Sequence, residues 1–113
     1  MNGISTHILD LTRGRPADGV PVRLHRHEHA SWRLVAARRT DKDGRITTML
    51  PLDEMLQEGF YRLRFGTSAY FRRQGFETFH PFVDIAFHVR NTEEHYHVPI
   101  LITPHSYSTY RGS

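Results

Sequence analysis

The chain has 113 residues, of which 38% are hydrophobic and 24% charged, and this balance indicates one globular domain rather than a disordered chain. It contains no cysteine, which excludes a disulfide framework and a thiolate metal site, while its net charge of +3 favours anionic ligands. The basic residues form no dense run and no apolar segment approaches the roughly 18 residues of a membrane span, so we expect neither nucleic-acid nor membrane binding.

The first predicted strand covers residues 4–10, where Ile4, Thr6 and Ile8 form the inward set of a half-buried strand. His7 then points away from the core, where a histidine is either solvated or part of a site. The preceding residues lack the basic and apolar pattern of a secretion leader. We therefore expect a cytoplasmic protein, or a periplasmic one if a leader was removed.

Alternating strands continue through the chain at 20–24, 32–36, 61–65, 83–89 and 95–102. In the second of these, Trp32, Leu34 and Ala36 are expected to share one face. Turn-forming residues separate the strands at 14–19, 41–44, 51–59 and 103–104. About eight short strands at this spacing predict an all-β, two-sheet β-sandwich, formed by residues 1–113 as a single domain.

One short helix is predicted over residues 67–74. Thr67 or Ser68 can cap its start, and Gly75 can end it. The aromatic residues that follow are interpreted as packing residues; they are Phe76, Phe79 and Phe82.

Three histidines recur at every second position near residue 27. A zinc site formed by His25, His27 and His29 is conceivable, although a tetrahedral site needs a fourth ligand and no cysteine is available. A mobile, charged hairpin loop is the favoured interpretation.

Arg45 follows a turn at residues 41–44, in which Gly44 can adopt the positive φ that such turns require. Arg45 is then either a surface residue of an ordinary hairpin or a planar cation held to grip an anionic or carbonyl-rich substrate.

The strand at 95–102 has one apolar face and one mixed face. Tyr96, Val98, Ile100 and Ile102 form the core face; His95, His97, Pro99 and Leu101 form the other. The mixed face indicates a subunit contact or a pocket floor, unless the two histidines are simply solvated. His97 and His7 together could supply general acid and base catalysis.

The last residues, Tyr110, Arg111, Gly112 and Ser113, are either a frayed end or a compact clamp of an aromatic ring, a cation and a carboxylate.

Several of these segments are similar to the sequence motifs of one protein family. They are 5–10 with Gly14 and Pro16, 40–45, 59–65, 95–99 and the final Tyr-Arg-Gly-Ser within 106–113. The chain resembles the 5-hydroxyisourate hydrolases, enzymes of urate breakdown related to the thyroid-hormone carrier transthyretin. The terminal tetrapeptide is the most specific match, because it distinguishes the hydrolases from transthyretin.

The resemblance implies a transthyretin-like sandwich that opens the ring of 5-hydroxyisourate. It places His7, Arg45 and His97 at the catalytic positions, and residues 110–113 at substrate-binding ones. It also implies a homotetramer, a dimer of dimers with active sites at the subunit contacts. Either His7 or His97 can be the base that activates water, and we expect no metal or cofactor, because imidazole and guanidinium groups can fill every role. The alternative is a transthyretin-like carrier that binds a small ligand without turnover.

Overall fold

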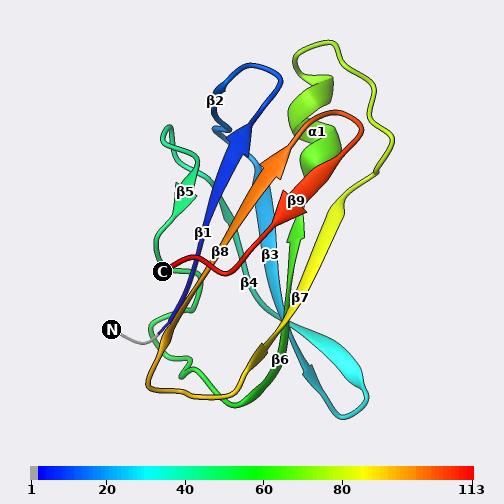
Figure 1. Cartoon of the computed structure of the whole chain (residues 1–113). Coiled ribbons are helices and arrows are strands. Elements are labelled where there is room, and N and C mark those ends of the chain that lie inside the picture. The colour runs from blue at the N-terminus through cyan, green and yellow to red at the C-terminus, as the bar shows by residue number, and fades with distance from the viewer. Residues whose placement is uncertain (1–2) are drawn as a thin grey trace.

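The computed structural model describes residues 3–113 as two β-sheets that face each other across one apolar core (Figure 1). The first sheet contains β1 (Gly3–Asp10), β2 (Arg15–Pro16), β5 (Arg45–Ile46), β8 (His95–Ile102) and β9 (Tyr107–Thr109). The second contains β3 (Pro21–Glu28), β4 (Ser31–Arg39), β6 (Gly59–Phe65) and β7 (Val83–Val89). The predicted two-sheet sandwich with one short helix is therefore confirmed.

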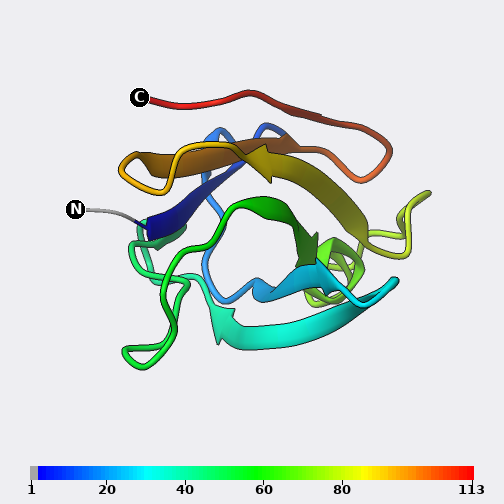
Figure 2. The same ribbon diagram turned by 90° about the horizontal axis from the view of Figure 1, so that it is seen from below.

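Strand β1 organises the first sheet. It runs parallel to β8 along its whole length, from Gly3 opposite His95 to Asp10 opposite Ile102. Its other edge pairs antiparallel with β5 and β2, while β9 pairs antiparallel with β8. Residues from both ends and the middle of the chain thus meet in one sheet, and the C-terminal segment continues across it (Figure 2).

The second sheet has the antiparallel order β4-β3-β6-β7. In its strand β4, the expectation that Trp32, Leu34 and Ala36 share one face is wrong. The register of β4 against β3 shifts at Leu24/His25, so that Ala36 pairs with Leu24 whereas Leu34 pairs with His25. Val35 is the extra residue of this β-bulge and packs with Ala36 against the core. Because the bulge breaks the alternation, Leu34 does not share a face with Ala36 and is 51% exposed.

The core lies between the inward faces of the two sheets. Its largest fully buried side chains include Tyr61, Phe65 and Phe71, and each contributes on the order of 2–3 kcal/mol through burial. Ile4 and Ile8 of β1 and Ile100 of β8 are also buried, as the alternation predicted. The outward faces of β1 and β8 are therefore free to carry polar groups.

Helix α1 (Thr67–Arg72) fills one end of the core with Tyr70 and Phe71. Its N-cap residue is Gly66 and no side chain caps it, so the predicted cap by Thr67 or Ser68 is wrong. Gly75 has a φ of +84° just after the helix, as expected for a residue that ends it. Within the described part of the chain, no helix is long and apolar enough to cross a membrane.

The aromatic residues after α1 are not core residues. Phe76, Phe79 and Phe82 are 41%, 75% and 39% exposed, although Phe76 packs edge-on against Phe71, with ring centroids 6.4 Å apart. Phe82 instead lies against the guanidinium of Arg64, whose Cζ is 3.9 Å from the ring centroid.

Candidate active site

A cavity of about 200 Å³ lies on the outward face of the first sheet, where β1, β5 and β8 meet the C-terminal segment. Eight residues line it: Ser5, Thr6, Arg45, Ile46, Thr47, His95, His97 and Ser113. Three of the residues singled out from the sequence, Arg45, His97 and Ser113, are thus brought together from distant parts of the chain.

Strand pairing places the polar side chains side by side. His7 of β1 is the register partner of Arg45 in β5, and Ser5 is the partner of His97 in β8. Ser5 and His7 are two residues apart and so share the outward face of β1. His7 is half-buried and flanks the cavity beside Arg45.

The turn before β5 fixes both Arg45 and His7. The Asp41 carboxylate accepts hydrogen bonds from the backbone N–H groups of Asp43 (2.9 Å) and Arg45 (3.0 Å). Gly44 has a φ of +74°, and a Cβ there would lie 2.5 Å from the carbonyl oxygen of Ile8. The imidazole Nε2 of His7 lies 3.0 Å from the carbonyl oxygen of Asp43. The turn is therefore tightly packed against β1 and bonded to the histidine beside Arg45.

The hydroxyl of Ser5 connects two imidazoles. Its Oγ lies 2.7 Å from Nδ1 of His97 and 2.8 Å from Nε2 of His95. Ser5 is 7% exposed, so protein groups rather than bulk water satisfy its hydroxyl. The sequence alone did not single out Ser5, since only the parallel register of β1 and β8 shows that it faces His97.

His97 is the histidine whose electrostatic environment is most informative. Burial lowers its pKa below the ordinary value of 6.5, and the positive charges of Arg45, His7 and His95 lower it further. The neutral imidazole therefore predominates at pH 7, as a general base requires.

The C-terminal segment lies across β8 and covers part of its outward face. The N–H of Gly112 donates to the carbonyl oxygen of His97 (2.9 Å), and the Thr109 hydroxyl donates to that of Pro99 (2.7 Å). A Cβ on Gly112 would lie 2.5 Å from Cδ2 of His97, so this glycine packs directly on the imidazole. Pro99 is buried beneath this segment, which contradicts its expected role as open surface for a partner or a pocket.

Tyr110 and Arg111 line a neighbouring cavity of about 270 Å³, and His97 is in the wall of both cavities. The Arg111 guanidinium donates to Glu94 (2.7 Å) and lies over the ring of Tyr96, with Cζ 4.5 Å from its centroid. In a single chain, Arg111 is therefore directed away from the cavity that contains Arg45.

The histidines near residue 27 do not form the expected loop. His25 and His27 lie within β3, and only His29 and Ala30, with φ of 52° and 64°, form the turn. His27 packs edge-on against Trp32, with ring centroids 5.0 Å apart. Across residues 3–113, no three histidine, cysteine or acidic side chains gather in a way that could hold a metal ion.

The two-sheet sandwich with a histidine–arginine cavity on its parallel β1/β8 pair defines a transthyretin-like protein. A model of the HIUase/Transthyretin family matches residues 4–112, and the chain belongs to this family.

Named relatives agree with this assignment. The chain is 44% identical to the 5-hydroxyisourate hydrolase of Caulobacter vibrioides over 117 aligned positions, which cover all of both chains. Its structure matches that of 5-hydroxyisourate hydrolase from Klebsiella pneumoniae with a TM-score of 0.87 and 40% identity, covering 100% of each chain. It also matches sea bream transthyretin in complex with thyroxine, with a TM-score of 0.90, 29% identity, and coverage of 96% of this chain and 93% of that one.

Proposed function

We propose that this protein hydrolyses 5-hydroxyisourate, opening the ring at a cyclic amide bond to give 2-oxo-4-hydroxy-4-carboxy-5-ureidoimidazoline. The observation that carries the proposal is the cavity that gathers Arg45, His97 and Ser113 from three separate segments. It also rests on membership of the HIUase/Transthyretin family and on relatives named as hydrolases of this compound.

We assign activation of the attacking water to His97. If its Nδ1–H donates to Ser5 and the Ser5 hydroxyl donates to His95, Nε2 of His97 is left with a free lone pair. No hydrogen-bond partner of Nε2 occurs among residues 3–113, so this atom can take the proton of a water molecule as it attacks a ring carbonyl. The proton then passes to the nitrogen of the breaking amide bond. The lowered pKa of His97 supports this assignment.

Arg45 and His7 bind the substrate in this mechanism. The Arg45 guanidinium supplies positive charge and N–H donors for the oxygen that becomes negative during attack. A carbonyl oxygen only accepts hydrogen bonds, so His7 carries a proton on the Nε2 that faces Asp43. That bond fixes the orientation of the His7 ring beside Arg45. These roles need no metal or cofactor.

The C-terminal residues complete the site. Ser113 lines the cavity, and Gly112 holds the segment against His97. We assign Tyr110 and Arg111 to substrate binding through the neighbouring cavity that His97 shares.

We further propose that the active protein is a homotetramer, a dimer of dimers with these sites at the subunit contacts. The proposal rests on the similarity to proteins of the HIUase/Transthyretin family and on the position of the candidate site on the outward face of the first sheet, where a second chain can reach it.

The test is to add freshly generated 5-hydroxyisourate and follow the decay of its ultraviolet absorbance. We expect turnover well above spontaneous decay, and a loss of at least about 100-fold in His97→Ala, the usual size of a general-base contribution. His105→Ala, in the exposed turn before β9, is the matched control and should keep full activity.

Decay no faster than the spontaneous rate would overturn the proposal. It would favour a carrier of small ligands instead, a function consistent with the structural match to transthyretin.

A further inference from the structure

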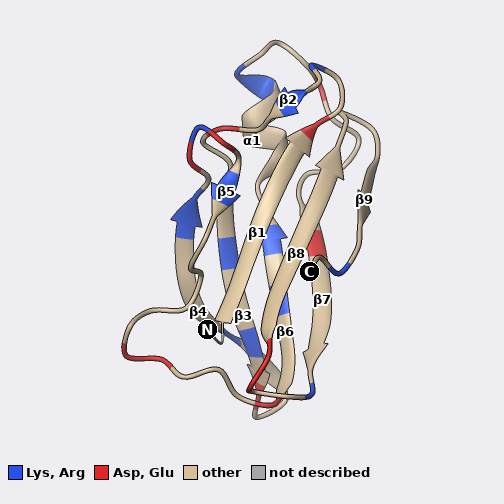
Figure 3. Cartoon of the chain, turned by 60° about the vertical axis from the view of Figure 1, so that its left-hand side comes forward, with Lys and Arg blue, Asp and Glu red and all other residues tan. Residues whose placement is uncertain are grey.

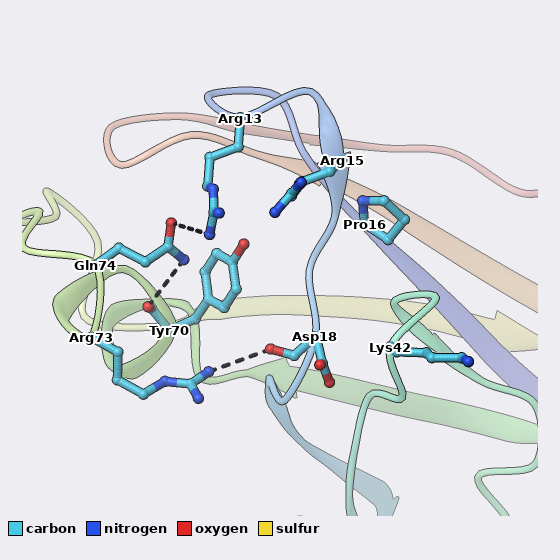
Figure 4. A pocket seen from close by; sticks show the side chains of 8 residues that line it. All are labelled: Arg13, Arg15, Pro16, Asp18, Lys42, Tyr70, Arg73 and Gln74. Atoms are coloured by element: carbon cyan, nitrogen blue, oxygen red, sulfur yellow. Dashed lines mark hydrogen bonds between the residues drawn. The ribbon is translucent and has the colours of Figure 1, made fainter.

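A third cavity, of about 380 Å³, lies at the end of the sandwich where β2 and α1 are found (Figures 1 and 4). Eight residues line it: Arg13, Arg15, Pro16, Asp18, Lys42, Tyr70, Arg73 and Gln74. It shares no residue with the candidate active site, and the hydrolysis proposed above makes no use of it.

The lining of this cavity is strongly basic. Four of its residues are cations and only Asp18 is an anion. Within residues 3–113, ion pairs form at Arg26, Arg33, Arg62, Arg64 and Arg111, and none of these arginines lines the cavity. Lys and Arg residues are visible at this end of the chain in Figure 3.

The hydrogen bonds of the cavity arginines go to neutral groups. Arg13 donates to the amide oxygen of Gln74 (3.0 Å), and Arg73 donates to the backbone oxygen of Asp18 (3.3 Å). Neither acceptor removes positive charge. With four cations in the lining against Asp18 there and Asp10 beneath it, the cavity keeps an excess of positive charge that an anion can balance.

The floor of the cavity is rigid because of a buried carboxylate. Asp10 is fully buried, and its Oδ2 accepts a hydrogen bond from the Tyr70 hydroxyl (2.7 Å). Its Oδ1 accepts from the backbone N–H groups of Thr12 (2.9 Å) and Arg13 (3.3 Å). Asp10 thus ties the backbone of the loop that carries Arg13 to the helix that carries Tyr70.

The cavity arginines lie on two sides of the Tyr70 ring. In Figure 4, Arg13 and Arg15 extend from the loop toward the Tyr70 hydroxyl, and Arg73 extends from the helix side. Lys42 points away from the three arginines and so belongs to the rim. Planar guanidinium groups bind phosphate and carboxylate oxygens in pairs, and a phosphate monoester carries roughly −1.5 to −2 charges at neutral pH.

We propose that this cavity binds a small molecule that carries a phosphate group. The volume of about 380 Å³ falls at the lower end of the roughly 300–1,000 Å³ typical of ligand sites, so there is room for a ligand larger than a single phosphate. Arg13 and Arg15 bind the phosphate oxygens, Tyr70 and Gln74 form the wall beside them, and Arg73 adds positive charge on the other side of the Tyr70 ring.

The experiment is calorimetric titration of the full chain with inorganic pyrophosphate at constant, low ionic strength. We expect saturable binding of one pyrophosphate per chain. Arg15→Gln should weaken it about 10-fold or more, because a charge-assisted hydrogen bond is lost. Arg72→Gln is the matched control, because it also removes one positive charge but at the end of α1, outside the cavity. It should leave the affinity for pyrophosphate essentially unchanged.

Arg13→Gln is a second test variant, and a melting curve shows whether losing its bond to Gln74 disturbs the fold. Arg15→Gln remains decisive if Arg13→Gln unfolds. Three results would each overturn the proposal: pyrophosphate binding that does not saturate, equal weakening by Arg15→Gln and Arg72→Gln, or tighter binding of citrate than of pyrophosphate. The last would assign the cavity to carboxylates.

Discussion

The Ser5 hydroxyl has one proton and lies within hydrogen-bonding distance of two imidazoles. It can donate to only one of them at a time and must accept from the other, if both bonds are made. The tautomers of His95 and His97 are therefore coupled through Ser5. With the Nδ1–H of His97 held by Ser5, Nε2 can take the proton of the attacking water and the resulting imidazolium can deliver it to the leaving nitrogen as the amide bond breaks, so the same ring serves first as base and then as acid.

We expect Ser5→Ala to lower kcat by up to roughly 100-fold with little change in KM, because the reacting nitrogen of His97 is no longer held in place. Ser5→Thr, which keeps the hydroxyl, should recover part of the loss. Steady-state kinetics on the two variants measure this. A Ser5→Ala enzyme with unchanged kcat would remove Ser5 from the mechanism.

The pH dependence of hydrolysis follows from His97. Burial and the nearby charges of Arg45, His7 and His95 lower its pKa below 6.5, and a base must be unprotonated to act. We therefore expect kcat/KM to rise with pH, with an inflection below pH 6.5. The profile for Arg45→Gln should move toward higher pH, since a positive charge near His97 is gone. An inflection above 6.5 in the unmodified protein would contradict this assignment.

Gly112 offers a test of the C-terminal contact. In Gly112→Ala the new Cβ would lie 2.5 Å from the His97 ring, so either the ring or the segment must move. We expect a loss of roughly 100-fold in turnover, the cost of misplacing a reacting group by about 1 Å. The melting temperature should change little, because Gly112 lies outside the core. Unchanged turnover would show that the position of this segment does not matter for catalysis.

At the scale of secondary structure, the turn at residues 41–44 is the element on which the site most depends. Gly44→Ala should lower the free energy of unfolding by at least about 1–3 kcal/mol, the cost of a side chain at positive φ, with a further cost from the close approach to Ile8. Hydrolysis should fall as well, because Arg45 follows directly.

Gly14→Ala is the matched control for this variant. Gly14 has a φ of +68°, but its Cβ would meet no atom within 4 Å. The difference between the two variants in chemical denaturation therefore isolates the steric contact. Equal destabilisation by both would contradict the proposed packing of the turn against β1.

The strands could be predicted from the sequence, but the contacts between them could not. The alternation of apolar and polar residues predicted the strands and the outward placement of His7 and His97. Such a pattern can be read from sequence because it depends only on residues close together in the chain. The β4 bulge and the exposure of Phe79 depend on contacts between distant segments, which alternation does not encode. Ser5 was missed for the same reason, since its role follows from parallel pairing with β8.

For the whole molecule, we expect light scattering at micromolar concentration to give four times the 13.2 kDa mass of the chain. A monomeric mass together with full hydrolytic activity would show that one chain holds a complete site, and would overturn the placement of sites at subunit contacts.

The parallel pairing of β1 with β8 also bears on biosynthesis. Ser5 and His97 are 92 residues apart in sequence yet are bonded side by side. A ribosome adding about 5–20 residues per second needs roughly 5–20 seconds to make the intervening polypeptide. During that interval the nascent β1 has one edge without its native neighbour, and an unpaired strand edge invites association with other chains. Chaperones that shield emerging polypeptides would therefore find in residues 3–10 a segment that needs protection until translation has passed β8.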